Sequence, residues 1–237
     1  MTNLNISEHF FSIQGEGKTM GIPSIFLRLQ ACNLLCNWKI NGVDHYCDTL
    51  EVWKKGSPYT PEQLLKVFEY EGYLSQLQNN AHLILTGGEP TLQQDAFVEF
   101  YRLLPFIIYT EIETNGTILM KKEFYNIIDQ INCSPKLNNS NIPKERRYKP
   151  EVLSQIAISP KSIFKFVINK QEDITEILND FINPFRIHNH KVWLMPECST
   201  RDELHNKQTM VVELCKKYGF NFSDRLQVSI WNKCTGV

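Results

Sequence analysis

Short apolar runs alternate with amphipathic segments along most of the chain. Such runs are typical of buried strands, and we expect strands at 25–29, 82–87, 106–114, 130–135, 163–168, 191–196 and 225–231. The segments between them carry apolar residues at helical spacing, which predicts helices at 61–77, 93–104, 119–128, 172–181 and 201–218. Thr60 followed by Pro61 favours a helix start, because threonine is a good N-cap and proline is tolerated at the first helical position.

Strands that alternate with helices indicate βα units with parallel pairing. About six such units within 237 residues predict one α/β domain, a partial, open βα barrel of about six parallel strands. In folds of this class, ligands bind at the C-terminal ends of the strands. The unusual motifs of the chain fall there: the cysteine-containing segment 32–47, GGEP at 87–90, ETNGT at 113–117, CSPK at 133–136, Asn169-Lys170 and MPEC at 195–198. This agreement indicates that the motifs form one site.

The charge pattern offers no sign of a nucleic-acid or membrane partner. The formal net charge is -1, and nucleic-acid binders usually carry a basic excess or stripe. The short basic cluster at 144–149 lies in a polar segment, 138–150, which we expect to be a mobile, solvated surface loop. The longest apolar stretch, 103–109, contains a proline and is far shorter than the ~20 residues that span a bilayer. We therefore expect a soluble, cytoplasmic protein.

Seven cysteines make a complete disulfide framework impossible and suit a reducing compartment. Free cysteine is usually buried, and this is the role expected for the four that stand apart, Cys133, Cys198, Cys215 and Cys234.

The other three, Cys32, Cys36 and Cys47, lie close together in sequence. Three thiolates can hold three irons of a [4Fe–4S] cluster and leave the fourth iron open to a small molecule. Zinc is the main alternative, with His45 as a fourth ligand, although structural zinc sites usually have a second cysteine pair, which is missing here. Spacing favours the cluster and leaves zinc open, whereas the neighbouring GGEP and the strand-end pattern strengthen the cluster interpretation.

Longer motifs carry a resemblance to a known family. The stretch FFSIQGEGKTMGIPSIFLRLQACNLLC, followed by CDT at 47–49, resembles the N-terminus of the 7-carboxy-7-deazaguanine synthase family of radical S-adenosylmethionine (SAM) enzymes. Further matches follow in order along essentially the whole chain: LTGGEP, ETNGT, SPK, KFV, LMPE and QV-x-x-W. The resemblance implies a radical SAM type of barrel and a carbon–nitrogen lyase of queuosine-type 7-deazaguanine biosynthesis.

The family converts 6-carboxy-5,6,7,8-tetrahydropterin to 7-carboxy-7-deazaguanine with loss of ammonia. The resemblance implies that a reduced [4Fe–4S] cluster cleaves SAM to methionine and a 5′-deoxyadenosyl radical, which takes a hydrogen from C6 of the pterin. Mg2+ assists the ring contraction in the family. An electron donor such as flavodoxin and a homodimeric assembly are implied in the same way.

The resemblance also assigns cofactor residues. Cys32, Cys36 and Cys47 match the cluster ligands, and Thr49 matches the Mg2+ ligand, whose hydroxyl oxygen suits a hard ion. Gly87 and Gly88 allow close backbone approach. In addition, Glu89 is expected to accept the methionine amino group of SAM. The full set expected to contact SAM is Tyr46, Cys47, Asp48, Gly88, Glu89, Ser134, Pro135, Lys136, Met195, Pro196 and Glu197.

A second set is implied to bind the pterin. Gln14 and Glu16 are chemically matched to its amide and amino edge, and the planar fork of Arg28 suits the substrate carboxylate. The whole substrate-binding set is Ile13, Gln14, Gly15, Glu16, Arg28, Thr86 and Val237.

The chain departs from the family at one conspicuous point. Ten residues, 37–46, separate Cys36 from Cys47, where the family commonly has only a pair. Asn41-Gly42 is a strong signal for a tight turn, so we expect an inserted hairpin or flap that returns the chain to the cluster. In addition, Ser229 stands where the family often has histidine. Two alternatives stay open: another radical SAM enzyme, such as a glycyl-radical activase, and a non-catalytic iron–sulfur or zinc-binding protein.

Overall fold

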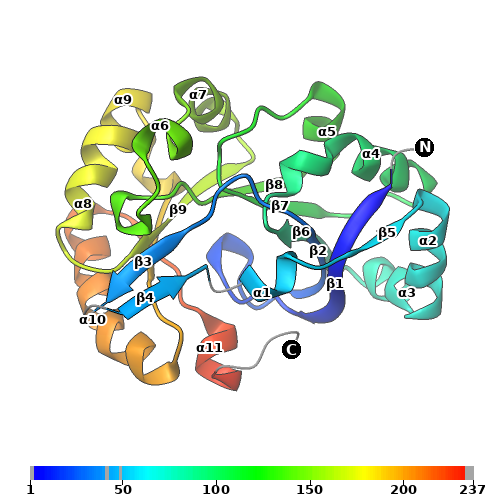
Figure 1. Ribbon diagram of the computed structural model, residues 1–237, viewed down its shortest axis with the longest axis horizontal. Helices are drawn as coiled ribbons and strands as arrows, with labels where there is room; N and C mark the ends of the chain where they lie inside the picture. Colours follow the sequence, from blue (N-terminus) through cyan, green and yellow to red (C-terminus); the bar gives the residue numbers. More distant parts are fainter. Residues whose placement is uncertain (1–2, 41–42, 48–49, 233–237) are drawn as a thin grey trace.

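The computed structural model describes residues 3–40, 43–47 and 50–232, without the side chains of 37–46 and 50–51 (Figure 1). The main sheet has nine strands in the order β11-β10-β9-β8-β7-β6-β2-β1-β5. From β2 through β6 to β11 each neighbouring pair is parallel, whereas β1 and β5 are antiparallel to their neighbours at one edge. The strands are β1 (Leu4–Ile13), β2 (Pro23–Leu29), β5 (Ser57–Tyr59), β6 (His82–Gly87), β7 (Thr110–Thr114), β8 (Gln130–Cys133), β9 (Ser162–Ile168), β10 (Val192–Pro196) and β11 (Asn221–Phe222).

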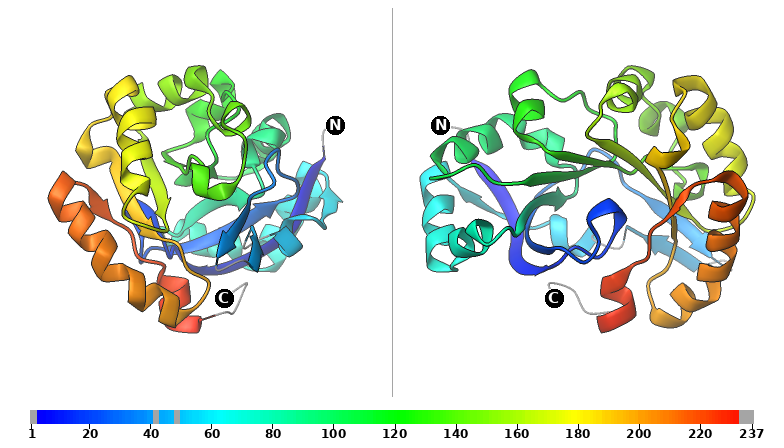
Figure 2. Two further views of the ribbon diagram at one scale, coloured as in Figure 1. Left: turned by 60° about the vertical axis from the view of Figure 1, so that its left-hand side comes forward. Right: turned by 180° about the vertical axis from the view of Figure 1, so that it is seen from behind.

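The sheet is curved and stays open between β11 and β5, with helices along its outer side (Figure 2). This confirms the prediction of an open, largely parallel α/β sheet. The α-helices are α1 (Leu50–Trp53), α2 (Pro61–Tyr70), α3 (Tyr73–Gln78), α4 (Gln94–Leu103), α5 (Lys122–Ile127), α6 (Lys144–Arg147), α7 (Pro150–Ile158), α8 (Asp173–Glu176), α9 (Asn183–Phe185), α10 (Arg201–Tyr218) and α11 (Leu226–Trp231). Short 3-10 turns lie at η1 (Gly17–Thr19), η2 (Pro90–Gln93), η3 (Asn138–Ser140) and η5 (Asn189–Lys191), and η4 (Ile177–Ile182) is a π-helix.

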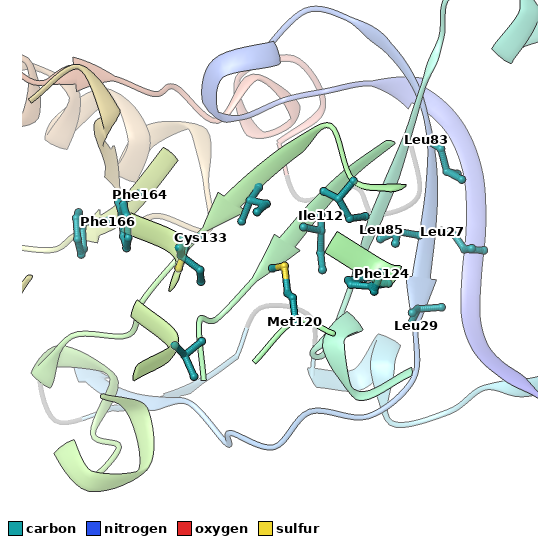
Figure 3. Packing of buried hydrophobic residues seen from close by; sticks show 14 of the residues in the cluster. Leu27, Leu29, Leu83, Leu85, Ile112, Met120, Phe124, Cys133, Phe164 and Phe166 are labelled. Atoms are coloured by element: carbon teal, nitrogen blue, oxygen red, sulfur yellow. The ribbon is translucent and has the colours of Figure 1, made fainter. Parts of the chain in front are cut away.

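The core lies between the sheet and these helices. Alternate strand residues such as Leu85, Ile112 and Phe164 are fully buried there, together with helix residues such as Phe124 (Figure 3). Because side chains alternate between the two faces of a strand, the intervening residues point to the concave face. These are mainly polar, so one face of each strand builds the core and the other is available for a site.

Local sequence explains the boundaries of α2 and the start of α3. At α2, Thr60 accepts a hydrogen bond from the Gln63 backbone and the Gln63 side chain accepts one from Thr60, a complete capping box. The helix expected over 61–77 is divided in two, because Gly72 has a φ of 72°, a left-handed conformation that ends α2 and precedes α3. Cys133, Cys198 and Cys215 are buried, as expected, whereas Cys234 lies outside the described residues.

Two expectations were wrong. The segment 225–231 was expected to be a strand, but β11 covers only Asn221–Phe222 and Leu226–Trp231 forms α11. Its alternating apolar residues do not share a buried face: Val228 is buried against Cys198 and Leu204, whereas Ile230 is 46% exposed.

Likewise, the segment 138–150 is not simply a solvated loop, because it forms η3 and α6 and buries Arg147. Within the part of the chain that the structure describes, no helix is long and apolar enough to span a membrane.

Candidate active site

The three clustered cysteines meet in one small apolar patch beyond the end of β2. Cys36 is buried with Leu34 and Ile142, and Cys32 and Cys47 pack against this group. The Cys47 backbone N–H donates to the Cys36 carbonyl at 3.0 Å. Burial raises the pKa of the Cys32 thiol to about 11, so its thiolate form requires a compensating cation such as a metal centre.

The residues between Cys36 and Cys47 form a hairpin. Strand β3 (Asn37–Ile40) pairs antiparallel with β4 (Val43–Tyr46), and the pairing of Asn37 with Tyr46 closes its base. The two ends of the long insert therefore lie side by side, which places Cys47 next to Cys36.

The three thiols are a donor set that fits a [4Fe–4S] cluster. Among the described side chains, no group of three or more histidine, cysteine or acidic residues converges on one metal position, and the side chain of His45, the fourth ligand of the zinc alternative, is not among them. In a [4Fe–4S] cluster each thiolate binds a different iron, so the sulfurs surround a larger object.

The glycines of GGEP allow the thiol loop, residues 30–36, to lie against the end of β6. The Gly88 N–H donates to the Leu29 carbonyl at 3.2 Å and the Glu89 N–H donates to the Ala31 carbonyl at 2.9 Å. A β-carbon on Gly88 would lie 2.0 Å from the Ala31 oxygen and 2.8 Å from the Cys32 β-carbon. Only glycine therefore fits at this position without moving the thiol loop.

The Glu89 carboxylate is completely buried and is bound by the protein itself. It accepts hydrogen bonds from the Thr91 N–H at 3.1 Å and hydroxyl at 2.5 Å, from the Thr114 hydroxyl at 2.8 Å and from the Asn115 N–H at 2.7 Å. Burial raises the pKa of Glu89, and these hydrogen bonds oppose the rise without cancelling it.

Asn115 extends this network to the cysteines. Its amide nitrogen donates to the Asn33 side chain at 3.0 Å and lies 3.9 Å from the Cys32 sulfur. Asn33 in turn donates to the Thr117 hydroxyl at 2.7 Å. The ends of β6 and β7 and the thiol loop are therefore one hydrogen-bonded unit.

A pocket lies beside this unit, at the C-terminal ends of β8, β9 and β10. It is lined by Pro135 and Lys136 from the SPK motif, by Glu197 from LMPE, and by Asn139, Ser140, Val167 and Asn169. Two motifs distant in sequence thus share one cavity. The Glu197 carboxylate pairs with Lys207, which also donates to the Asn169 side-chain oxygen at 2.8 Å.

The concave face carries a buried charge cluster centred on Glu16. Lys165 pairs with one carboxylate oxygen, and Arg225 at 3.1 Å and Gln227 at 2.7 Å donate to the other. Burial alone would raise the pKa of Glu16, but the attraction of Lys165 and Arg225 outweighs it and holds this pKa well below its usual range. Burial likewise opposes the charge of Lys165, yet the neighbouring Glu16 raises its pKa above the usual value.

A second polar group lies on the same face. Arg28 and Thr86 are cross-strand partners of β2 and β6. The Arg28 Nε donates to Glu8 at 2.7 Å, and the Thr86 hydroxyl donates to Glu113 at 2.7 Å. Gln14 approaches the same Glu113 carboxylate at 3.4 Å.

Comparisons with known proteins agree with this geometry. The 7-carboxy-7-deazaguanine synthase of Halobacterium salinarum is 32% identical over 249 residues, which cover 97% of this chain and 91% of that protein. The chain belongs to the 7-carboxy-7-deazaguanine synthase family. The synthase of Pyrobaculum aerophilum is 28% identical, with 98% and 97% of the two chains covered. The crystal structure of QueE from Escherichia coli has the same fold, with a TM-score of 0.69 at 23% identity over 94% of each chain. No family model matches.

In this member of the synthase family, the structure brings most of the expected site residues together. Cys32, Cys36, Cys47, Gly88 and Glu89 lie in the thiol-loop unit, and Pro135, Lys136 and Glu197 line the pocket. Ser134 is tied by its N–H to Thr114 at 2.7 Å, and Met195 and Pro196 are buried in β10 beside the pocket. Four expectations lie outside the described residues: Asp48, Thr49, Val237 and the side chain of Tyr46.

The substrate set divides between the two groups of the concave face. Gln14, Arg28 and Thr86 share the Glu8–Glu113 side, whereas Glu16 is held by Lys165 and Arg225. Gly15 is in close contact with Gln227, because a β-carbon there would lie 2.0 Å from the Gln227 oxygen. Ile13 ends β1 and is 37% exposed.

Sequence reasoning missed several residues of this synthase. On the concave face these are Glu8, Lys165, Arg225 and Gln227, and in the pocket Asn139, Ser140 and Val167. For Lys165 a signal was present, since it begins the KFV match; for Gln227 it was the QV-x-x-W match. Asn169 had only its place at a strand end.

Proposed function

We propose that this enzyme converts 6-carboxy-5,6,7,8-tetrahydropterin to 7-carboxy-7-deazaguanine with loss of ammonia, by radical SAM chemistry. One observation carries the proposal. Strands β2 and β6 pair Arg28 with Thr86, the two residues proposed to bind substrate, on the concave face. The next paired residues, Leu29 and Gly87, lead directly into the thiol loop and GGEP. A substrate held by the first pair would therefore lie beside a cofactor held by the second set.

In this proposal, Cys32, Cys36 and Cys47 hold the [4Fe–4S] cluster. When bound, the cluster supplies the electron that cleaves SAM to methionine and a 5′-deoxyadenosyl radical. The chain's own contribution is to bind and orient SAM. The pocket between the SPK and LMPE strand ends would take its nucleoside part, and the GGEP turn its methionine part. Glu89 would reach the methionine amino group only through whatever acceptor capacity its four protein donors leave.

The pterin would lie on the concave face. Arg28 donates Nε–H to Glu8, and its guanidinium has five N–H donors in a planar fork, so donors exist for the substrate carboxylate. Gln14 and Glu113 offer an amide and a carboxylate to the amide and amino edge of the pterin. Glu16 is neutralised by Lys165 and Arg225, so it acts here by shaping the face rather than by adding net negative charge.

Further parts of the proposal rest on the family resemblance. Thr49 would supply a hydroxyl ligand to Mg2+, Val237 would contact the substrate, and the enzyme would be a homodimer reduced by a donor such as flavodoxin. A cluster held by cysteine thiolates suits a reducing compartment, so the enzyme would work in the cytoplasm.

The test is turnover under strict anaerobiosis. Reconstituted protein is mixed with the carboxytetrahydropterin, SAM, Mg2+ and a strong reductant, and the products are read by mass spectrometry. We expect 7-carboxy-7-deazaguanine from the natural chain and from Cys215→Ala, and neither product nor 5′-deoxyadenosine from Cys47→Ala. 5′-Deoxyadenosine without 7-carboxy-7-deazaguanine from the natural chain would overturn the substrate assignment. Full activity of Cys47→Ala would overturn the cluster assignment.

A further inference from the structure

The segment from Asn138 to Arg147, here termed the clamp segment, connects the cofactor pocket with the thiol loop. At the pocket, Asn139 and Ser140 form part of the lining. On its other side, which faces α8, the Asn138 N–H donates to Glu176 at 2.8 Å. The segment is thus fixed to the scaffold on one side and exposed to the ligand pocket on the other.

Its second half reaches the cysteines. Ile142 is 5% exposed and packs against Leu34 and Cys36. The Arg146 Nη2 donates to the Asn33 carbonyl, between Cys32 and Leu34, at 3.0 Å. In addition, η3 lies beside β3, the first strand of the inserted hairpin. One segment therefore contacts the pocket, the thiol loop and the insert.

Arg147 holds the two halves together. It is 3% exposed, its Nε donates to the Ile142 carbonyl at 3.0 Å, and its Nη1 donates to the Lys136 carbonyl at 2.9 Å. It is also 2.7 Å from Glu176. A buried cation is costly unless it is paired and hydrogen-bonded. Here the planar guanidinium fixes the backbone of the SPK motif relative to the residue that packs on the cysteines.

We propose that the clamp segment sets the position of the thiol loop relative to the cofactor pocket, with Arg147 as its positioning residue. The inserted hairpin rests on the same segment, so the clamp also supports the part of the chain that returns Cys47 to Cys36. This inference deepens the proposed function and rests on it, because it takes the thiol loop as the cluster site and the pocket as the SAM site. If the clamp loosens, SAM binds more weakly and its cleavage is less well coupled to product formation.

A purely local role makes a different prediction from a clamp. If Arg146 and Arg147 only stabilise α6, their substitution loosens α6 alone. If they form a clamp, a substitution on the cysteine side also loosens the pocket side, and a substitution on the pocket side also loosens the cysteine side. This is because the segment contacts both.

Hydrogen exchange measured by mass spectrometry separates these roles without any cofactor. The variants are Arg146→Gln, whose side chain is exposed, and Arg147→Lys, which keeps the charge but loses the fork. The matched control is Arg102→Gln, which removes an exposed ion pair with Glu123 on α4 and α5. We expect each clamp variant to speed exchange about fivefold, the effect of one lost hydrogen bond, in both 30–36 and 134–142. Faster exchange confined to 144–147 would overturn the proposal. If Arg147→Lys does not fold, Arg146→Gln decides alone.

Cofactor binding provides the second readout. In reconstituted protein, iron and sulfide content, the dissociation constant for SAM, and the ratio of 5′-deoxyadenosine to 7-carboxy-7-deazaguanine are measured. We expect both variants to keep a full cluster, to bind SAM about fivefold more weakly and to show a higher ratio, while Arg102→Gln matches the natural chain. Unchanged SAM affinity and ratio in both variants would overturn the clamp. A natural chain that holds no cluster would instead sink the proposed function, and hydrogen exchange would still decide whether the clamp exists.

Discussion

Gly88 and Ala31 are in such close contact that a β-carbon on Gly88 would lie 2.0 Å from the Ala31 carbonyl oxygen. Ala31 itself has a φ of 74°, an uncommon conformation for a residue with a side chain. The end of β6 therefore fixes an unusual turn of the chain immediately before Cys32.

Substituting Gly88 by alanine is expected to displace the thiol loop. The clash is with backbone, which cannot rotate away, so we expect a loss of about 1–3 kcal/mol in the free energy of unfolding and a fall in cluster content after reconstitution. Iron and acid-labile sulfide analysis and thermal unfolding check this. The matched control is Gly72→Ala, where no atom lies within 4 Å of the added carbon and only the φ of 72° is strained. A normal cluster content in Gly88→Ala would show that the loop tolerates displacement.

Glu89→Gln tests whether this carboxylate works first as a structural acceptor. The side chain accepts four hydrogen bonds from Thr91, Thr114 and Asn115, and glutamine places an N–H group where one oxygen meets donors. Leaving such buried groups unpaired costs about 1–3 kcal/mol each. We therefore expect lower stability and lower cluster content, measured by unfolding and iron analysis before any SAM is added. A stable variant with a full cluster and only weakened SAM binding would show that contact with methionine is the main role.

Glu16 and Lys165 should stay ionised across the physiological range. The pKa of Glu16 lies far below its ordinary value of 4.5, and the pKa of Lys165 lies above its ordinary value of 10.5. The stability from Glu16 is therefore fully present above pH 4.5 and is lost as the pH falls toward its folded pKa. The stability from Lys165 is present below pH 10.5 and lost only as the pH rises through its folded pKa.

The corresponding experiment compares the natural chain with Glu16→Gln between pH 3.5 and 9.5 by chemical unfolding. The lower limit lies about one pH unit below the unfolded pKa of glutamate, and the upper limit about one unit below that of lysine. Glu16→Gln leaves the buried Lys165 without its carboxylate and removes one acceptor of the half-buried Arg225, so a loss of about 3–5 kcal/mol is expected. The difference between the two proteins should shrink below about pH 4.5, as Glu16 of the natural chain loses its advantage. It should also shrink at high pH, because loss of Glu16 lowers the pKa of the buried Lys165 in the variant. A difference that does not shrink below about pH 4.5 would contradict the assignment of Glu16 as a fixed negative charge.

The sequence predicted those parts of the candidate site that are formed by residues close together in the chain. Cys32, Cys36, GGEP and SPK are contiguous motifs at strand ends, and parallel βα topology necessarily brings strand ends together. The open parallel sheet followed from the same alternation of apolar runs. What could not be predicted is pairing across the chain: Lys165 lies 149 positions from Glu16 in sequence, and Arg225 lies 209 positions from it. The sequence around Glu16, Lys165 or Arg225 contains no pattern that identifies its partner.

Two errors have one physical cause. The segments 225–231 and 138–150 were judged by their own composition, but tertiary contacts decide them. As α11, the former carries Gln227 to Glu16, and the latter buries Arg147 because backbone carbonyls and Glu176 compensate its charge. Sequence patterns describe the conformation that a segment prefers in isolation, whereas the conformations of these two segments are decided by their contacts with other elements.

The role of Arg28 is separable from that of the cofactor set, and this makes it the sharpest test of the substrate assignment. Arg28→Lys keeps a positive charge beside Glu8 but loses the planar fork that suits a carboxylate. We expect KM for the pterin to rise about tenfold or more, the effect of one lost charge-assisted hydrogen bond, with SAM affinity and cluster content unchanged. Arg102→Lys, in an exposed ion pair with Glu123, controls for loss of an arginine and should behave as the natural chain. If instead SAM binding falls while KM for the pterin is unchanged, Arg28 serves the cofactor through the thiol loop, which begins two residues later, and the carboxylate must be bound elsewhere on the concave face.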